Sequence, residues 1–234
     1  MKRMHRGIFI TGTDTGIGKT FVAAGLIEAI RGKGINVCPM KPVETGCKIK
    51  NGRLVPADAV KLLDASGIDE SLDAVNPYRF RQPLAPAVAA EHEGVVIKRS
   101  KLISAYNRLS KSCDFIVIEG AGGIMTPVYK EYLCLDLIKD LALPLIIVSR
   151  AGLGTINHTL LTIEAARSRG INLHGVIINH ASGAGKDLSE KSNPEIIESI
   201  GKVPVLGIIP YLKNPALLSS QLVFHSIAEK IIRI

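Results

Sequence analysis

IFITGTDTGIGKT, the stretch from Ile8 to Thr20, determines how the rest of the chain is arranged. Its apolar start is followed by a glycine-rich turn, then by Lys19 and Thr20, and then by a helix-like segment. A strand, such a turn and a helix N-terminus in this order are typical of a phosphate-binding loop, because backbone N–H groups and the positive helix end converge on anionic oxygens. We therefore predict nucleotide binding, with Lys19 reaching the β- and γ-phosphates and the Thr20 hydroxyl contacting Mg²⁺.

The spacing of this loop departs from the common pattern. The usual motif has one residue fewer between its first glycine and its Gly-Lys pair than the five that separate Gly12 from Gly18. An ordinary glycine-rich turn with a solvated lysine therefore remains an alternative.

Length and composition predict a single α/β domain over residues 1–234. Tryptophan is absent and aromatic residues make up 4% of the chain, so we expect a core of Ile, Leu, Val and Ala. No stretch approaches the ~20 apolar residues of a membrane span. The apolar run after the basic start is too short for a signal peptide. We expect a cytoplasmic protein with no membrane partner.

The formal charge of +8 comes from basic residues scattered along the chain. Nucleic-acid-binding proteins usually cluster their Lys and Arg side chains, often among aromatic residues. We therefore predict no nucleic-acid partner and expect the charge to attract anionic substrates. The four cysteines lack metal-ligand spacing and are expected to be reduced thiols: Cys38, Cys47, Cys113 and Cys134.

Apolar runs alternate with amphipathic helical segments along the chain. This pattern predicts a three-layer α/β fold, a mostly parallel sheet with helices on both faces. Right-handed connections would bring the carboxyl ends of the strands to one edge, where ligands bind in such folds. The predicted strands are 8–13, 36–43, 115–120, 145–150, 175–179 and 205–210. The predicted helices are 19–31, 57–65, 100–110, 135–141, 155–169, 194–200 and 221–232, with a loop and short helix within 75–94.

The motif KPVETG, residues 41–46, ends the second predicted strand. A lysine crowded beside phosphates can stabilise a transferred phosphoryl group, so Lys41 is a candidate catalytic residue. The Thr45 hydroxyl and the Gly46 backbone N–H could bind a carboxylate. Asp58 lies near a predicted helix start, where it could cap the helix or bind Mg²⁺. A solvated Lys41 before an ordinary turn is the alternative.

The motif IEGAGG, residues 118–123, ends the third predicted strand. An acidic residue at the end of a buried strand is what Mg²⁺ near a phosphate loop requires, and Glu119 holds this position. The glycines that follow would allow the backbone to approach an anion closely. A structural glutamate that caps a turn is the alternative.

Two further polar motifs follow the later strands. GLGTINHT, residues 152–159, places Asn157 and His158 at a helix start, but no Ser/His/Asp set can be assigned, which disfavours nucleophilic catalysis. GVIINH places Asn179 at a strand end, where its amide could pair with an adenine edge. The segment from Ile208 to Leu212 could form a wall beside the base. Ordinary strand-to-loop connections would explain the last two motifs equally well.

Taken together, the motifs resemble those of the dethiobiotin synthetase family. The resembling segments, in chain order, are GTDTGIGKT, KPVETG, Asp58, VNPYRF with PLAP, VIEGAGG, GLGTINHT and VIINH. They extend from near residue 8 to about residue 214. The longer spacing before Gly18 is itself that family's form of the loop.

The resemblance implies a P-loop NTPase-like fold and an ATP- and Mg²⁺-dependent cyclo-ligase of the penultimate step of biotin synthesis. One amine of 7,8-diaminononanoate would capture CO₂, available from bicarbonate, as a carbamate. The carbamate would attack the γ-phosphate, and the second amine would close the ureido ring. The resemblance also implies a homodimer in which the neighbouring subunit's helix start, Gly154 to Asn157, reaches the substrate carboxylate.

The resemblance further implies roles for individual residues. Lys41 and Lys19 would be catalytic, and the Mg²⁺ ligands would be Thr20, Asp58 and Glu119. The implied substrate contacts are Thr15, Thr45, Gly122, Gly154 and Asn157. The implied nucleotide contacts are Gly16, Ile17, Gly18, Lys19, Thr20, Phe21, Asp58, Glu119, Gly120, Ala121, Gly122, Asn179, His180, Ile209, Pro210 and Tyr211. Some family members carry glutamate at the Gly16 position, so only backbone contacts are expected there, and the segment after Asn214 aligns poorly.

Two other classes of protein share features with this chain. Switch ATPases of the partitioning type have the same fold, but they usually carry a lysine early in the loop, where this chain has Thr13 and Asp14. The C-terminal segment FHSIAEKIIRI could resemble their membrane helix, although a packed terminal helix is the favoured account. A non-enzymatic nucleotide-binding domain fused to a larger enzyme is the third possibility, and 234 residues leave no room for the partner domain.

Overall fold

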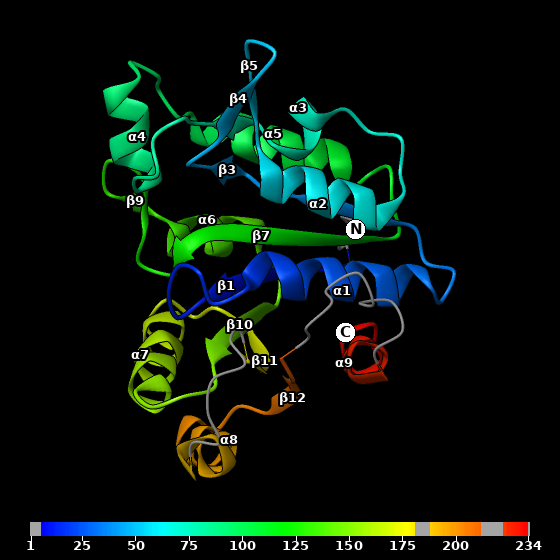
Figure 1. Cartoon of the computed structure of the whole chain (residues 1–234), viewed down its shortest axis with the longest axis vertical. Helices are drawn as coiled ribbons and strands as arrows, with labels where there is room; N and C mark the ends of the chain where they lie inside the picture. The colour runs from blue at the N-terminus through cyan, green and yellow to red at the C-terminus, as the bar shows by residue number, and fades with distance from the viewer. Residues whose placement is uncertain (1–5, 181–187, 212–221, 234) are drawn as a thin grey trace.

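Six parallel strands form the central sheet of the computed structural model, which describes residues 6–180, 188–211 and 222–233. Their order is β12-β11-β10-β1-β7-β2, and every neighbouring pair is parallel. The strand before the phosphate loop, β1, thus lies inside the sheet between β10 and β7 (Figure 1). The bounds are β1 (Gly7–Gly12), β2 (Val37–Met40), β7 (Phe115–Gly123), β10 (Leu145–Arg150), β11 (Leu173–Asn179) and β12 (Val205–Ile209). All six predicted strands are confirmed.

The helices also follow the predicted order. They are α1 (Lys19–Arg31), α2 (Ala57–Ser66), α5 (Arg99–Leu109), α6 (Cys134–Leu141), α7 (Thr155–Ser168), α8 (Leu188–Gly201) and α9 (Leu222–Ile231). The predicted start of α8 at Pro194 is wrong, since proline favours the first turn of a helix but here lies inside one. Gln221, the predicted start of the last helix, lies outside the described residues. Within the described residues, every helix is too short or too polar to cross a membrane.

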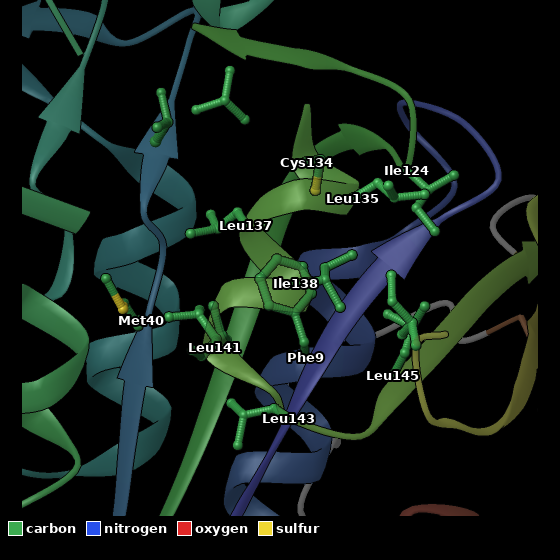
Figure 2. Close-up of a cluster of buried hydrophobic side chains, with 14 of the residues drawn as sticks. Phe9, Met40, Ile124, Cys134, Leu135, Leu137, Ile138, Leu141, Leu143 and Leu145 are labelled. Atoms are coloured by element: carbon green, nitrogen blue, oxygen red, sulfur yellow. The ribbon is translucent and has the colours of Figure 1, made fainter. Parts of the chain in front are cut away.

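Alternating side chains of the strands form two hydrophobic cores, one on each face of the sheet. On β1, Ile8 and Ile10 face the core that α1, α2 and α9 cover. Phe9 faces the other core, which is covered by α4 (Pro86–His92) and by α5, α6, α7 and α8. Figure 2 shows Phe9 among side chains of α6 that include Ile138 and Leu141. The predicted three-layer arrangement is confirmed.

Aromatic rings contribute more to these cores than the composition suggests. The largest fully buried side chains include Phe9, Phe80, Phe115 and Phe224. The predicted core of Ile, Leu, Val and Ala is therefore incomplete, because a few large rings each bury more area than a smaller side chain. A small number of aromatic residues can therefore still fill a large share of the core.

The packing of α9 on α1 depends on one glycine. Gly25 lies inside α1, and a Cβ at this position would come within 2.5 Å of the Phe224 ring. Glycine inside a helix costs roughly 0.5–1 kcal/mol relative to alanine. Close contact between the ring and the helix backbone offsets this cost, since Phe224 is only 1% exposed.

We expect Phe224→Ala to lower the free energy of unfolding by about 3–5 kcal/mol, because it leaves a cavity between α1 and α9. Urea unfolding followed by circular dichroism would measure the change. Leu222, which is 83% exposed on the same helix, provides the matched control. Leu222→Ala should change the free energy by no more than about 0.5 kcal/mol. Equal effects of the two substitutions would show that α9 does not belong to the cooperative core.

Several short elements were not predicted. They are β3 (Val43–Glu44) paired with β6 (Tyr78–Arg79), the hairpin of β4 (Lys48–Lys50) and β5 (Arg53–Val55), the pair β8 (Pro127–Tyr129) and β9 (Tyr132–Leu133), and α3 (Leu72–Val75). Strands of two or three residues are too short to show a hydrophobic period. The short helix expected within 75–94 is present as α4 (Pro86–His92).

Candidate active site

The glycine-rich loop after β1 leads directly into α1. Gly18 precedes the helix with φ 91°, a left-handed conformation that favours glycine. A Cβ at Gly18 would also lie 2.3 Å from Nδ2 of Asn179. Because Gly18 has no side chain to cap the helix, the first N–H groups of α1 can point to phosphate oxygens.

Asn179, at the end of β11, anchors this loop by a hydrogen bond. Its Nδ2 donates a hydrogen bond of 2.8 Å to the carbonyl oxygen of Ile17, and the residue is 2% exposed. Oδ1 of Asn179 is buried without a hydrogen-bond partner among the described residues. One side of the amide thus supports the loop, and the other remains able to accept a hydrogen bond from a ligand.

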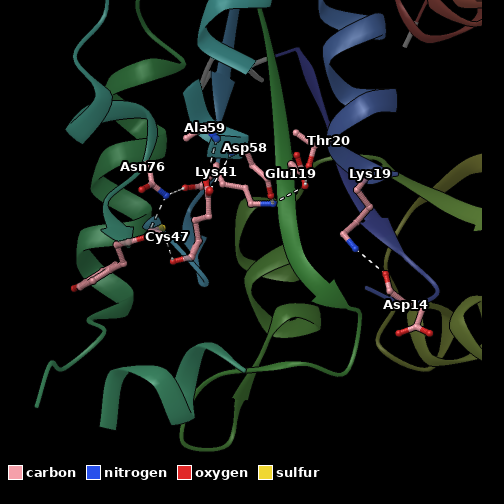
Figure 3. A network of polar contacts seen from close by, with 11 residues as sticks. Asp14, Lys19, Thr20, Lys41, Cys47, Asp58, Ala59, Asn76 and Glu119 are labelled. Atoms are coloured by element: carbon pink, nitrogen blue, oxygen red, sulfur yellow. Dashed lines mark hydrogen bonds and ion pairs between the residues drawn. The ribbon is translucent and has the colours of Figure 1, made fainter. Parts of the chain in front are cut away.

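Lys19, the first residue of α1, turns back over the loop. Its Nζ donates a hydrogen bond of 2.7 Å to the carbonyl oxygen of Asp14, as Figure 3 shows. Burial, and then the positive charge of Lys41, lower the pKa of Lys19. Placing anionic oxygens beside it would oppose both effects and favour the charged amine.

A second lysine is enclosed by carboxylates at the ends of β2 and β7. Nζ of Lys41 lies 2.5 Å from Oε1 of Glu119 and 3.1 Å from Oδ2 of Asp58 (Figure 3). The Thr20 hydroxyl donates to the same Glu119 oxygen at 2.9 Å. Lys41 and Glu119 are 4% and 1% exposed, so their pair is removed from water, whereas the Asp58 side chain is 42% exposed. The alternative of a solvated Lys41 therefore does not hold, and Asp58 pairs with Lys41 in addition to its place in the first turn of α2.

Lys41 and the Asp58 carboxylate beside it each favour the charged form of the other. Burial would lower the pKa of Lys41, but the charges of Glu119 and Asp58 and their hydrogen bonds raise it overall. Burial would raise the pKa of Asp58, but the charge of Lys41 and the hydrogen bonds from Lys41 and Thr20 lower it. Lys41 is therefore a permanently charged amine at neutral pH, suited to stabilising an anion rather than to acting as a base.

The loop, the lysines and the carboxylates line one cavity of about 290 Å³. Eleven of the site residues predicted above lie around it: Thr15, Gly16, Gly18, Lys19, Thr20, Lys41, Thr45, Asp58, Glu119, Ala121 and Gly122. Thr45 comes from the segment after β2, and Gly122 comes from the end of β7. Residues more than a hundred positions apart in sequence thus meet at the predicted edge of the sheet.

The other predicted nucleotide contacts lie outside this cavity. The side chains of Ile17 and Ile209 are in the hydrophobic core, which leaves only their backbone at the sheet edge. Gly120 faces Phe9 and Cys134, and the ring of Phe21 packs against Phe224. His180, Pro210 and Tyr211 follow β11 and β12, on the Asn179 side of the loop.

One expectation for the KPVETG segment is wrong. The backbone N–H of Gly46 donates to the carbonyl oxygen of Gln82 at 3.1 Å, so it is not free to bind a carboxylate. The contact joins the loop after β3 to the loop after β6, a pairing between distant segments that the sequence pattern does not reveal. Thr45 keeps its place in the cavity.

Sequence reasoning also missed Glu44, which lines the cavity and is 5% exposed. Its two carboxylate oxygens accept hydrogen bonds from the backbone N–H groups of Asp58 and Ala59, both at 3.0 Å. Burial raises the pKa of Glu44. The only available sequence signal was an acidic residue shortly after Lys41, at the end of an apolar run, and such a residue is not specific.

Gly154 and Asn157 lie at the start of α7, outside the 290 Å³ cavity. A second cavity, of about 490 Å³, separates α7 from the phosphate loop. It is lined by residues of the loop, the segment after β7, and α7, among them Thr13, Thr15, Met125, His158 and Leu161. Thr15 borders both cavities.

The oxygen atoms around Lys41 suit a Mg²⁺ ion. Mg²⁺ is usually bound by one or two carboxylates together with water and substrate phosphates. Thr20, Asp58 and Glu119 supply such oxygens, and Oε2 of Glu119 is buried without a hydrogen-bond partner among the described residues. Since the described residues contain no cluster of three or more His, Cys, Asp or Glu that could hold a metal ion, phosphate oxygens would have to complete the coordination.

Comparison with known proteins identifies related families and folds. A family profile described as an AAA domain matches residues 6–216. Among solved structures, a MinC:MinD cell division complex from Aquifex aeolicus has a TM-score of 0.62 at 15% identity, covering 98% of this chain and 96% of that one. A ParA family ATPase from Chlorobium tepidum has a TM-score of 0.60 at 13% identity, covering 98% and 100%. At such identities these likenesses show the shared P-loop fold alone.

Sequence relatives are much closer. The ATP-dependent dethiobiotin synthetase BioD of Thermodesulfovibrio yellowstonii is 44% identical, over 89% of this chain and 90% of its own. The proteins of the same name from Methanocaldococcus jannaschii and Bacillus subtilis are 43% and 38% identical, over 86% and 97% of this chain and 92% and 95% of theirs. The chain belongs to the ATP-dependent dethiobiotin synthetase family.

Proposed function

We propose that the chain closes the ureido ring of dethiobiotin from 7,8-diaminononanoate, CO₂ and ATP. The single observation that carries this proposal is the enclosure of Lys41 beside the phosphate loop, in a cavity that also contains Lys19 and Thr15. A nucleotide-binding site needs only one of these lysines. Two lysines at one cavity suit a reaction that brings a second anion, the carbamate, to the γ-phosphate.

The proposed reaction has three steps. One amine adds to CO₂ and loses a proton to become a carbamate. A carbamate oxygen then forms a bond to the γ-phosphorus while the bond to the β-phosphate oxygen breaks and ADP leaves. The second amine attacks the carbamoyl carbon and closes the ring, while the bond from that carbon to the phosphate oxygen breaks and phosphate leaves with the proton that the amine loses. Lys19 and Lys41 would stabilise the negative charge that the second step gathers between the two anions.

The remaining residues would position the reactants. The N–H groups from Gly16 to Phe21 would bind the triphosphate, and Oδ1 of Asn179 would accept a hydrogen bond from the adenine amino group. Thr15, Thr45 and Gly122 would contact the diamine on the far side of Lys41. Mg²⁺, bound by Thr20, Asp58 and Glu119, would neutralise charge on the β- and γ-phosphates.

A direct assay tests the proposal. The protein is incubated with ATP, Mg²⁺, bicarbonate and 7,8-diaminononanoate, and ADP release is followed together with dethiobiotin by mass spectrometry. We expect ADP release that depends on the diamine and matches dethiobiotin formation one to one. ADP release that ignores the diamine but increases with DNA or lipid vesicles would instead support a switch ATPase.

We further propose that the active unit is a homodimer. Leu161 and Met125, which line the second cavity, are 61% and 58% exposed, and Leu153, just before α7, is 79% exposed. A second copy that covered them would bury this surface and could bring its own α7 start, Gly154 to Asn157, to the substrate carboxylate. The N–H groups and the positive end of that helix suit an anion.

We expect Leu161→Glu to convert the dimer into a monomer and to lower diamine-dependent ADP release about 100-fold or more, because each site would lose its carboxylate contact. Light scattering after gel filtration would give the mass, and the assay above would give the rate. Ile200, also 61% exposed but on α8, provides the control. Ile200→Glu should remain dimeric and active. A fully active monomeric Leu161→Glu variant would contradict the shared site.

A further inference from the structure

Helix α2 begins without a cap from its own chain segment. The residue before it is Pro56, which makes no side-chain hydrogen bond to the helix. The first N–H groups of a helix need a partner when they are buried. Those of Asp58 and Ala59 find one in Glu44, which lies 14 and 15 residues earlier in the sequence.

Glu44 therefore caps α2 from outside. Both hydrogen bonds are 3.0 Å, and each uses a different carboxylate oxygen. A carboxylate at this position also interacts favourably with the positive end of the helix. Because the side chain is 5% exposed, water does not compete effectively for these contacts.

The cap connects two parts of the active site. Glu44 holds the backbone N–H of Asp58, and the carboxylate of Asp58 in turn lies 3.1 Å from Nζ of Lys41. Between Glu44 and Asp58 the chain leaves the site through the hairpin of β4 and β5. Figure 3 shows Asp58 and Ala59 beside Lys41. The Glu44 carboxylate thus ties β3 to the first turn of α2 through these two hydrogen bonds.

From this geometry we propose that Glu44 is a positioning residue for the Mg²⁺·ATP site. It sets the place of the Asp58 carboxylate by capping α2, and each of its oxygens already accepts a hydrogen bond from a backbone N–H group of that helix. The inference rests on the proposed role of Asp58 as a Mg²⁺ ligand. Residues that orient a metal ligand typically change metal affinity about 10–100-fold when they are replaced.

The test measures how much Mg²⁺ tightens ATP binding. Calorimetry gives the ATP dissociation constant with saturating Mg²⁺ and with a chelator, and the ratio of the two is the Mg²⁺ gain. We expect Glu44→Ala to reduce the Mg²⁺ gain about tenfold, while the affinity for metal-free ATP changes less than about twofold. Glu44→Gln keeps the shape but turns an amide N–H₂ toward one helix N–H, so we expect an intermediate loss.

A matched control separates positioning from general loop anchoring. Glu93 also accepts hydrogen bonds from two backbone N–H groups, those of Arg81 and Gln82 at 2.7 and 3.4 Å, but it does not line the cavity. Glu93→Ala should keep the full Mg²⁺ gain. An equal loss in the Glu93 variant would overturn the proposal.

The double variant gives the sharpest outcome. If Glu44 acts through Asp58, adding Glu44→Ala to Asp58→Asn should cause no further loss of Mg²⁺ gain. Additive losses, or an unchanged gain in Glu44→Ala, would overturn the proposal, and Glu44→Gln supplies the same comparison if Glu44→Ala does not fold. Binding is measured without the diamine, so a protein that bound Mg²⁺·ATP but made no dethiobiotin would contradict the proposed reaction and leave the role of Glu44 intact.

Discussion

Lys41→Met is expected to lower the rate of dethiobiotin formation about 1,000-fold or more, while the ATP dissociation constant changes less than about threefold. The reason is the place of the amine. Lys41 is buried between Glu119 and Asp58 in the cavity that contains the phosphate loop, and its raised pKa keeps it charged. A fixed charge that stabilises developing negative charge acts on the transition state more than on bound ATP. Each tenfold of rate corresponds to about 1.4 kcal/mol of barrier.

Methionine is the appropriate replacement at this position because it fills the space of the lysine stem without its charge. Single-turnover measurements of ADP and dethiobiotin would give the rate, and calorimetry would give the ATP affinity. Lys111→Met, at an exposed lysine, controls for the loss of one positive charge and should keep full activity. Loss of ATP binding in Lys41→Met, equal to the loss of rate, would move Lys41 from the chemistry to nucleotide affinity.

Glu119→Gln is expected to raise the Mg²⁺ concentration needed for half-maximal activity about tenfold or more and to lower the maximal rate about 100-fold. Glu119 is 1% exposed and holds both Lys41 and the Thr20 hydroxyl through Oε1, while Oε2 has no hydrogen-bond partner among the described residues. A neutral amide binds Mg²⁺ more weakly than a carboxylate and leaves the charge of Lys41 less compensated.

A Mg²⁺ titration of the diamine-dependent rate would measure this effect, with thermal unfolding to show that the variant is folded. Glu131→Gln, at an exposed glutamate in the turn between β8 and β9, controls for the loss of one acidic group. It should titrate like the unchanged protein. If Glu119→Gln also titrated unchanged, Glu119 would be a structural partner of Lys41 and not a metal ligand.

Local sequence patterns predicted the elements of the fold well. The run Ile8–Ile10, the glycine-rich turn and the helix after Lys19 could be located because their signals lie within a few residues of one another. The short pairs β3 with β6 and β4 with β5 could not, since their two or three residues carry no period. The strand order, with β1 between β10 and β7, also escaped prediction, because it depends on which crossovers pack together.

For the site, the residue types were predictable and their partners were not. Lys41, Asp58 and Glu119 each stand at the end or start of a predicted element, so they could be named as candidates. Lys41 lies between the two carboxylates, at 2.5 and 3.1 Å, because β2 pairs with β7 and α2 packs beside β2. Neither contact can be read from the local sequence. The same long-range packing pairs the backbone N–H of Gly46 with the carbonyl oxygen of Gln82, and it makes Glu44 the cap of α2.

The sequence by itself determined the phosphate loop, the alternation of strands and helices, and the family to which the chain belongs, because these depend on residues that are near neighbours or recur in a fixed order. Only the tertiary structure decided which charged groups neutralise one another, which backbone N–H groups remain free for a ligand, and which side chains line the cavity. The physical reason is that hydrogen bonds and ion pairs act over a few ångströms, whereas the groups that form them at this site lie up to 162 residues apart in the chain.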